Sequence, residues 1–95
     1  MKLTFDKIVC NNTTYLLHES LETNAIYDGC TIVITCDKLS ITEGGFTIEE
    51  AKESFAEHFD FIFRRYNELP NDKLSNRVIE IKNELNRIVK EVINN

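Results

Sequence analysis

Apolar and polar residues alternate along the first half of the chain, in short runs separated by residues that are typical of turns. The alternating runs are residues 2–10, 13–18, 25–27, 30–36 and 39–42. A period of two is typical of strands that bury one face and leave the other in water. The pattern therefore predicts a sheet built from residues 2–42.

The first two runs flank a pair of asparagines, which tolerate the left-handed backbone of a tight turn, so we expect a hairpin here. In the first run, Leu3, Phe5 and Val9 are predicted to share the buried face. The register of the second run stays open, because Leu16 and Leu17 are adjacent and cannot both face one core.

Asp28-Gly29 predicts a second hairpin, since this pair suits the left-handed geometry of a two-residue turn. The strand after it carries Cys30 and Cys36 on the same face as Ile32 and Ile34. With three cysteines and no CxxC pair, the chain lacks the pattern of a disulfide framework or a zinc site. We expect its thiols to be buried and unreactive.

The second half of the chain has the three-and-four spacing of helices. Thr47 followed by Glu50 fits a capping box and predicts a helix over about 48–66, which ends before Pro70. Its apolar stripe consists of Ile48, Ala51, Phe55, Phe59, Ile62 and Tyr66. One such stripe indicates a helix that packs on a core with a single face.

A second helix is predicted over about 76–93, with Ser75 as its cap. Its apolar stripe consists of Val78, Ile81, Leu85, Ile88 and Val92. Because the connection between the two helices is short, we expect them to be antiparallel neighbours. An alternative for the last turn is that Val92 and Ile93 dock on a second subunit.

Strands followed by helices predict an α+β fold, because a parallel sheet would need the two to alternate. We expect one domain over residues 1–95, with an antiparallel sheet of about four strands and an antiparallel pair of C-terminal helices packed on one face. The predicted core consists of Ile32, Ile34, Phe55, Phe59, Ile62, Leu85 and Ile88.

The charge balance bears on the kind of partner, since 11 basic and 16 acidic side chains give a net charge of −5. Nucleic-acid binders usually present a basic face, so we expect no direct binding to nucleic acid, although Arg64, Arg65, Lys73 and Arg77 are close in sequence. An acidic protein is better matched to a basic protein partner. The absence of a long apolar run and of a signal-peptide core predicts a cytoplasmic protein with no membrane contact.

Four carboxylates, Glu49, Glu53, Glu57 and Asp60, share one face of the first predicted helix. Paired carboxylates can hold a metal or perform acid–base chemistry, but a face of this kind is more often simply solvated. The chain has no catalytic triad order, nucleotide-binding loop or metal motif, which predicts no enzyme, no cofactor and no metal. We therefore expect the four carboxylates to contact the basic protein partner.

Residues 28–59 resemble the core of a HicB-like antitoxin domain. The matching segments, in the family's order, are Asp28-Gly29, Cys30 to Cys36, Asp37-Lys38-Leu39, Thr42-Glu43-Gly44 and Thr47-Ile48-Glu49-Glu50-Ala51. The resemblance implies a domain that neutralises a small basic ribonuclease toxin by covering it, often as an oligomer. It departs from the family at Cys36, where a proline is usual, and no obvious strand follows the first helix. No ribbon-helix-helix or helix-turn-helix pattern is seen, so the resemblance implies nothing about operator binding.

These observations together predict a small acidic protein-binding regulator that covers a basic, toxin-like partner. One alternative is a stand-alone oligomeric interaction or inhibitor module, host- or phage-encoded and unrelated to toxin neutralisation; a small enzyme is the other. The sheet face bearing Thr31, Val33 and Thr35 competes with the helix face as the contact, because helices packed on one face of a sheet leave the other face open.

Overall fold

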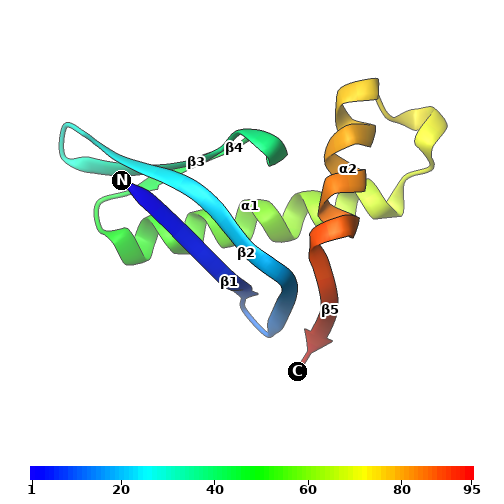
Figure 1. Cartoon of the computed structure of the whole chain (residues 1–95), viewed down its shortest axis with the longest axis horizontal. Coiled ribbons are helices and arrows are strands. Elements are labelled where there is room, and N and C mark those ends of the chain that lie inside the picture. The colour runs from blue at the N-terminus through cyan, green and yellow to red at the C-terminus, as the bar shows by residue number, and fades with distance from the viewer.

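The computed structural model describes residues 1–95 and contains five strands and two α-helices (Figure 1). The elements are, in chain order, β1 (Lys2–Cys10), β2 (Thr13–Asp28), β3 (Thr31–Cys36), β4 (Ile41–Gly45), α1 (Ile48–Glu68), α2 (Asn76–Ile88) and β5 (Val89–Asn94). Two 3-10 turns, η1 (Asp37–Leu39) and η2 (Asn71–Lys73), precede β4 and α2. All strands pair antiparallel, which confirms the α+β class but with one strand more than the sequence predicts.

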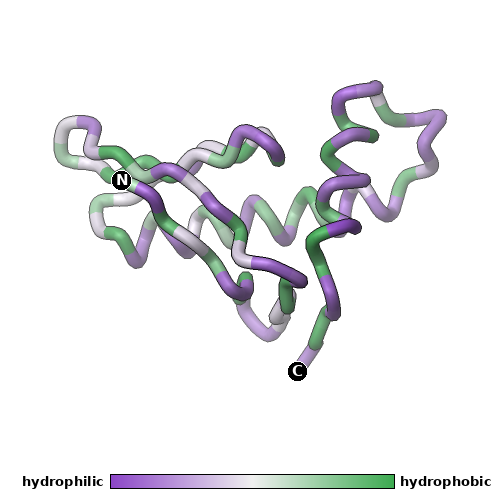
Figure 2. Tube along the Cα trace, in the orientation of Figure 1, coloured by the Kyte–Doolittle hydropathy of each residue, from purple (hydrophilic) through white to green (hydrophobic).

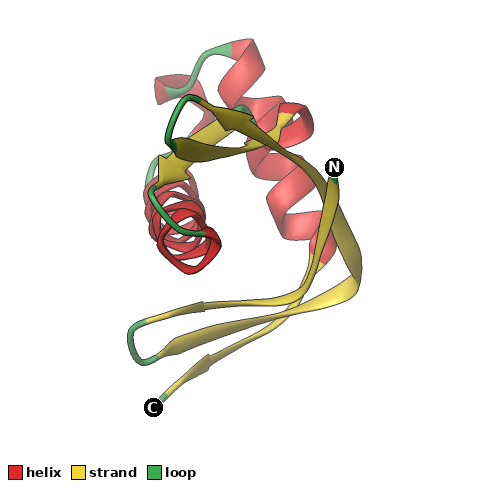
Figure 3. Cartoon of the chain, turned by 90° about the vertical axis from the view of Figure 1, so that its left-hand side faces the viewer, coloured by secondary structure: helices red, strands yellow, loops and turns green.

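The sheet is organised around β2, which is long enough to serve two sets of neighbours. β1 pairs with it along one edge; on the other edge β5 pairs with residues 13–17 and β3 with residues 24–28. We call β1, β5 and residues 13–17 of β2 the arm, and β3, β4 and residues 24–28 the β3–β4 half. Figure 3 shows the sheet bending so that both parts lie around α1.

The core confirms the sequence prediction, since every predicted core residue is buried. Phe55 and Phe59 are fully buried on α1, and both contact aromatic rings of the sheet. Phe55 stacks on Phe5 with ring centroids 4.9 Å apart, and Phe59 meets Tyr15 edge-on at 5.3 Å. Offset and edge-on pairs of this kind add stability beyond the area they bury.

Both helix starts form as predicted. The Thr47 Oγ1 accepts a hydrogen bond from the Glu50 amide at 3.1 Å, and the Ser75 Oγ accepts one from the Val78 amide at 3.3 Å. Each cap satisfies a backbone donor that the first turn of a helix leaves without a partner. Neither helix combines the length and the hydropathy that a membrane-spanning helix requires.

The predicted end of the second helix is wrong, because α2 stops at Ile88 and Val89–Asn94 form strand β5. The four-residue step from Ile88 to Val92 continues the helical spacing, so the pattern does not reveal the change. Val89, Val92 and Ile93 are β-branched and favour a strand when an edge is available. Residues 13–17 of β2 provide that edge, at a distance that no local pattern in the sequence reports.

The expected antiparallel helix pair is also wrong. Figures 1 and 3 agree that α2 lies across α1 rather than alongside it. The apolar face of α2 packs into the common core through Ile81, Leu85 and Ile88. On its exposed side the Arg77 Nη2 donates to the Asp37 carbonyl and to the Ser40 hydroxyl, both at 2.9 Å, which ties the start of α2 to η1 and to the residue after it.

Two local predictions in the sheet need correction. A bulge between Phe5 and Lys7 shifts the alternation of β1, so Ile8 is buried and Val9 is 50% exposed. Figure 2 shows the alternation of hydrophobic and hydrophilic positions along the chain trace. The second hairpin turn lies one residue later than predicted, because Asp28 pairs with Thr31 and Gly29 adopts a positive φ of 68°. Cys30 is therefore an exposed turn residue and not part of the core.

Candidate functional site

The structure separates the four carboxylates that the sequence groups together. Glu49, Glu53 and Glu57 lie exposed along the outer face of α1, and none of them takes part in an ion pair or a side-chain hydrogen bond. Asp60 instead turns toward the arm, where its Oδ1 accepts hydrogen bonds from the Tyr15 hydroxyl at 2.5 Å and the Arg64 Nε at 2.9 Å. Three of the carboxylates are thus free to contact a partner, whereas that of Asp60 is engaged within the chain.

Asp60 belongs to a polar network that joins α1 to the arm. The Arg64 Nη2 donates to the Thr13 Oγ1 at 2.8 Å, and the Thr13 hydroxyl donates to the Asn94 Oδ1 at 3.0 Å. Burial raises the pKa of the Tyr15 phenol, and the hydrogen bond to Asp60 raises it further. Tyr15 therefore stays protonated at neutral pH and acts as a hydrogen-bond donor in the network that joins the arm to α1.

The buried thiols fit the prediction at two of three positions. Cys10 and Cys36 are buried, and burial raises the pKa of both thiols above its ordinary value. Thiols with raised pKa values are poor nucleophiles at neutral pH. Cys30, predicted to be buried with them, is exposed because it lies in the turn before β3 begins.

An exposed aromatic ring, Phe61, extends the acidic face of α1 and was not among the predicted site residues. Phe61 lies one turn after Glu57 and is 63% exposed. Helix spacing alone could have found it, because positions 49, 53, 57 and 61 follow each other at steps of four. An aromatic ring surrounded by polar groups is typical of the centre of a protein interface.

A shallow hollow of about 380 Å³ lies beside this ring and is lined by Glu43, Ser54, Glu57, His58 and Phe61. The His58 Nδ1 and the Glu43 Oε2 are 2.9 Å apart across it. Its carboxylates and its ring suit the insertion of a cationic side chain.

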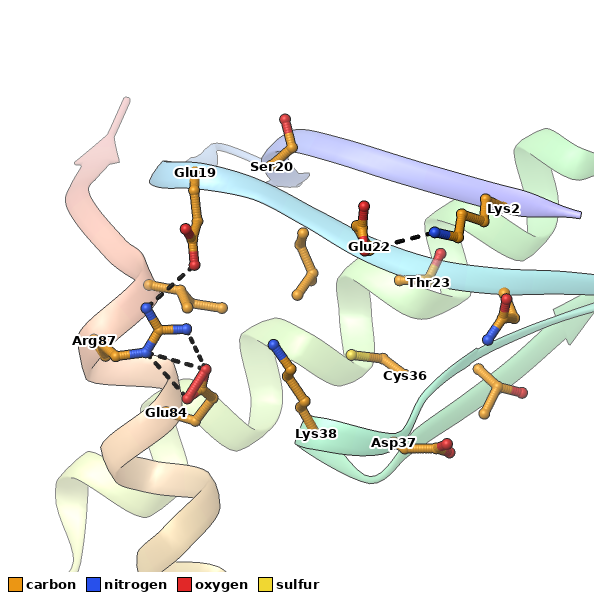
Figure 4. Close-up of a pocket in the computed structure, with 14 residues that line it drawn as sticks. Lys2, Glu19, Ser20, Glu22, Thr23, Cys36, Asp37, Lys38, Glu84 and Arg87 are labelled. Atoms are coloured by element: carbon orange, nitrogen blue, oxygen red, sulfur yellow. Dashed lines mark hydrogen bonds and ion pairs between the residues drawn. The ribbon is translucent and has the colours of Figure 1, made fainter.

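A larger hollow of about 500 Å³ opens between β2, η1 and the C-terminal end of α2 (Figure 4). It lies where residues 18–23 of β2 have no strand partner opposite β1, since β5 ends its pairing at Leu17 and β3 begins at Asn24. Arg87 pairs there with Glu84 and, at 3.2 Å, with Glu19. The hydrogen bond from Arg87 lowers the pKa of Glu84, so the charges of this hollow largely neutralise one another.

No group of three or more His, Cys, Asp or Glu side chains has the arrangement to hold a metal ion. Comparison with protein-family models, with curated proteins and with solved structures gives no match. The outer face of α1 combines three carboxylates that form no ion pair within the chain, those of Glu49, Glu53 and Glu57, with the exposed ring of Phe61.

Proposed function

We propose that the protein is a small acidic protein-binding regulator that covers a basic protein partner with the outer face of α1. The observation that supports this most directly is the row Glu49, Glu53 and Glu57, exposed and without cationic partners, which continues into the exposed ring of Phe61. Complementary charge would speed the encounter, and the ring would supply buried contact area once the complex forms.

The hollow beside Phe61 suggests how the contact would be centred. A lysine or arginine of the partner inserted there would meet the carboxylate of Glu57 and the face of the Phe61 ring. Arginine suits such a site because its planar guanidinium can pair with a carboxylate and stack on a ring. The sheet face with Thr31, Val33 and Thr35 is the competing surface, but it carries no charged side chain on β3.

The resemblance of residues 28–59 to a HicB-like antitoxin domain is consistent with this proposal. It would make the partner a small basic ribonuclease toxin, neutralised by being covered. The alternative, an interaction or inhibitor module unrelated to toxin neutralisation, shares the same surface and differs only in the partner. Ribonuclease activity in the captured partner, suppressed by this protein, would favour the antitoxin.

The test uses the purified protein as bait in lysate of its native cell, together with the triple variant Glu49→Lys, Glu53→Lys and Glu57→Lys. A matched control reverses Glu22, Asp28 and Asp72, which are also exposed carboxylates but lie off this helix, so the change in net charge is equal. We expect wild type and control to retain a basic protein that the helix variant loses.

The recovered protein then permits a quantitative measurement. Its association rate with the wild type should fall steeply as ionic strength rises, and the helix variant should associate slowly with a flatter salt dependence. Phe61→Ala should mainly speed dissociation. Identical salt slopes for the wild type and the helix variant would place the contact elsewhere, and tight binding of the bare protein to nucleic acid would argue against the proposal as a whole.

A further inference from the structure

The arm ends in a strand whose outer edge has no partner. β5 pairs with β2 alone, and Figure 1 shows it at the outside of the molecule. Such an edge is a template for another strand unless it is bulged, charged or covered. The pairing of β1 with β2 shifts register between Phe5 and Lys7, and that of β5 with β2 shifts register at Lys90. Beyond that shift, β5 pairs regularly from Glu91 to Asn94.

The outer edge of β5 also presents peptide groups with which another strand could pair. The Asn95 amide donates to the Asn12 carbonyl at 2.9 Å, so the alternation of an antiparallel ladder directs the peptide groups of Glu91 and Ile93 toward β2. The peptide groups of Val92 and Asn94 then point outward. The hydrogen bond from Thr13 to the Asn94 side chain fixes this end of the strand, which lowers the entropic cost of binding.

We propose that β5 pairs antiparallel with β5 of a second copy of this chain, which joins the two arms into one continuous sheet. This pairing is independent of the proposed function and uses a different surface. Val92 is 37% exposed on this edge, and Figure 2 shows a hydrophobic stretch just before the C-terminus. The row Val9–Thr14–Ile93 on the outer face of the arm would continue across the junction.

Symmetry and charge limit the register of such a pair. Two identical antiparallel strands related by a twofold axis must place one residue opposite its own copy, because opposed side chains share a face of the sheet. A centre at Lys90 or Glu91 would oppose like charges, which is destabilising. The centre therefore falls at Val92 or Ile93, where two apolar side chains meet.

A strand pair of this length buries little surface compared with the roughly 1,200 Å² of a small stable interface, so we expect weak, reversible dimerisation. The net charge of −5 on each copy opposes the association, and salt should therefore strengthen it. Binding of a basic partner should instead weaken with salt. The two proposals thus respond in opposite directions to ionic strength and can fail separately.

The first test is a cysteine scan of Lys90, Glu91, Val92 and Ile93 in a Cys30→Ser background, which removes the exposed native thiol. Under mild oxidation we expect a disulfide-linked dimer from Val92→Cys or from Ile93→Cys, but not from both. Residues opposite their own copies lie about 4.5–5.5 Å apart, whereas a two-residue offset exceeds the roughly 7 Å that a disulfide can bridge. Equal linking at all four positions, or linking only at 90 or 91, would overturn the proposal.

The second test is sedimentation equilibrium of the unmodified chain over a wide range of concentration and at two salt concentrations. We expect the mass to rise from 11.0 kDa toward twice that value, and more readily at high salt. Val92→Pro removes an amide that points away from β2, so its fold should survive while its mass stays that of a monomer. Val92→Thr is the matched control that keeps the amide. A wild-type mass that stays at 11.0 kDa at every concentration would contradict the pairing.

Discussion

The two parts of the sheet are held against α1 by different kinds of contact. The β3–β4 half supplies Ile32, Ile34 and Ile41 to the core, so its buried contacts are apolar. Its polar contact with α1, between Glu43 and His58, lies in the hollow beside Phe61. The arm also supplies an apolar layer, but it adds the hydrogen bonds of Tyr15 and Thr13 to α1 side chains. The first kind of contact depends on shape and burial alone, whereas the second depends on direction and on protonation.

The two parts also differ in how far apart in sequence their partners lie. β3, β4 and α1 follow one another along the chain. The bond from Tyr15 to Asp60 spans 45 residues, and the one from Thr13 to Asn94 spans 81. The arm is therefore assembled from the two ends of the chain, and its closure carries a larger loss of chain entropy. This difference predicts which substitutions lower the free energy of unfolding most and which part of the molecule is sensitive to pH.

Phe59→Ala should have the largest effect, because Phe59 is fully buried on α1 and its ring meets Tyr15 of the arm. We expect a loss of roughly 3–5 kcal/mol in the free energy of unfolding, measured by chemical denaturation. The matched control Phe61→Ala lies two residues away with an exposed ring and should change it by less than about 0.5 kcal/mol. A loss below about 1 kcal/mol at Phe59 would mean that the arm does not pack on α1.

Tyr15→Phe should have the next largest effect on stability. It removes only a hydroxyl, so it tests the hydrogen bond of the arm separately from its apolar packing. Hydrogen bonds to charged groups contribute about 1.5–3 kcal/mol, and we expect the low end because Asp60 keeps its bond to Arg64. Ile34→Val, which trims one methylene from the β3–β4 half, should cost about 0.5–1.5 kcal/mol. Equal stability of Tyr15→Phe and wild type would show that the network contributes nothing to the arm.

The contact of Tyr15 in the arm should also make stability depend on pH. The pKa of Tyr15 is raised in the folded state, so its contribution is complete below the ordinary tyrosine pKa of about 10 and is lost as pH rises above it. Above pH 10 the unfolding free energy of the wild type should fall faster than that of Tyr15→Phe, by up to about 1.4 kcal/mol per pH unit. Denaturation at several alkaline pH values measures this difference, and parallel curves would contradict the assigned role of Tyr15.

The β3–β4 half and α1 could be predicted from the sequence because their signals are local. The alternation of Ile32 and Ile34 and the cap at Thr47 each lie within a few residues of what they determine. The arm could not be predicted in the same way. Its register depends on a bulge after Phe5, and its third strand reads as helix because the step from Ile88 to Val92 fits both structures.

Local sequence signals likewise predict some residues of the candidate site and not others. Glu49, Glu53 and Glu57 are exposed on one face of α1, as helix spacing predicts. Asp60 follows Glu57 by three residues and is expected on the same face, but it hydrogen-bonds with Tyr15 and Arg64 instead. No pattern near residue 60 reveals a tyrosine that lies 45 positions away. Phe61 could have been recognised, since a large apolar residue off the buried stripe of a helix is a surface residue.

Thr47→Ala should have the smallest effect on stability. It tests whether a change at the start of α1 stays confined to that region of the molecule. The substitution leaves the Glu50 amide without its acceptor at the start of α1, which should cost about 1 kcal/mol. Ser75→Ala removes the equivalent acceptor at the start of α2, so it is the matched control for a cap on the helix that leads into the arm. Both variants should lower the melting temperature by similar amounts, because each cap serves one amide next to solvent. Hydrogen exchange distinguishes them further: Thr47→Ala should speed exchange only in the first turn of α1, and faster exchange in β5 would show that the two parts of the sheet are coupled through that helix.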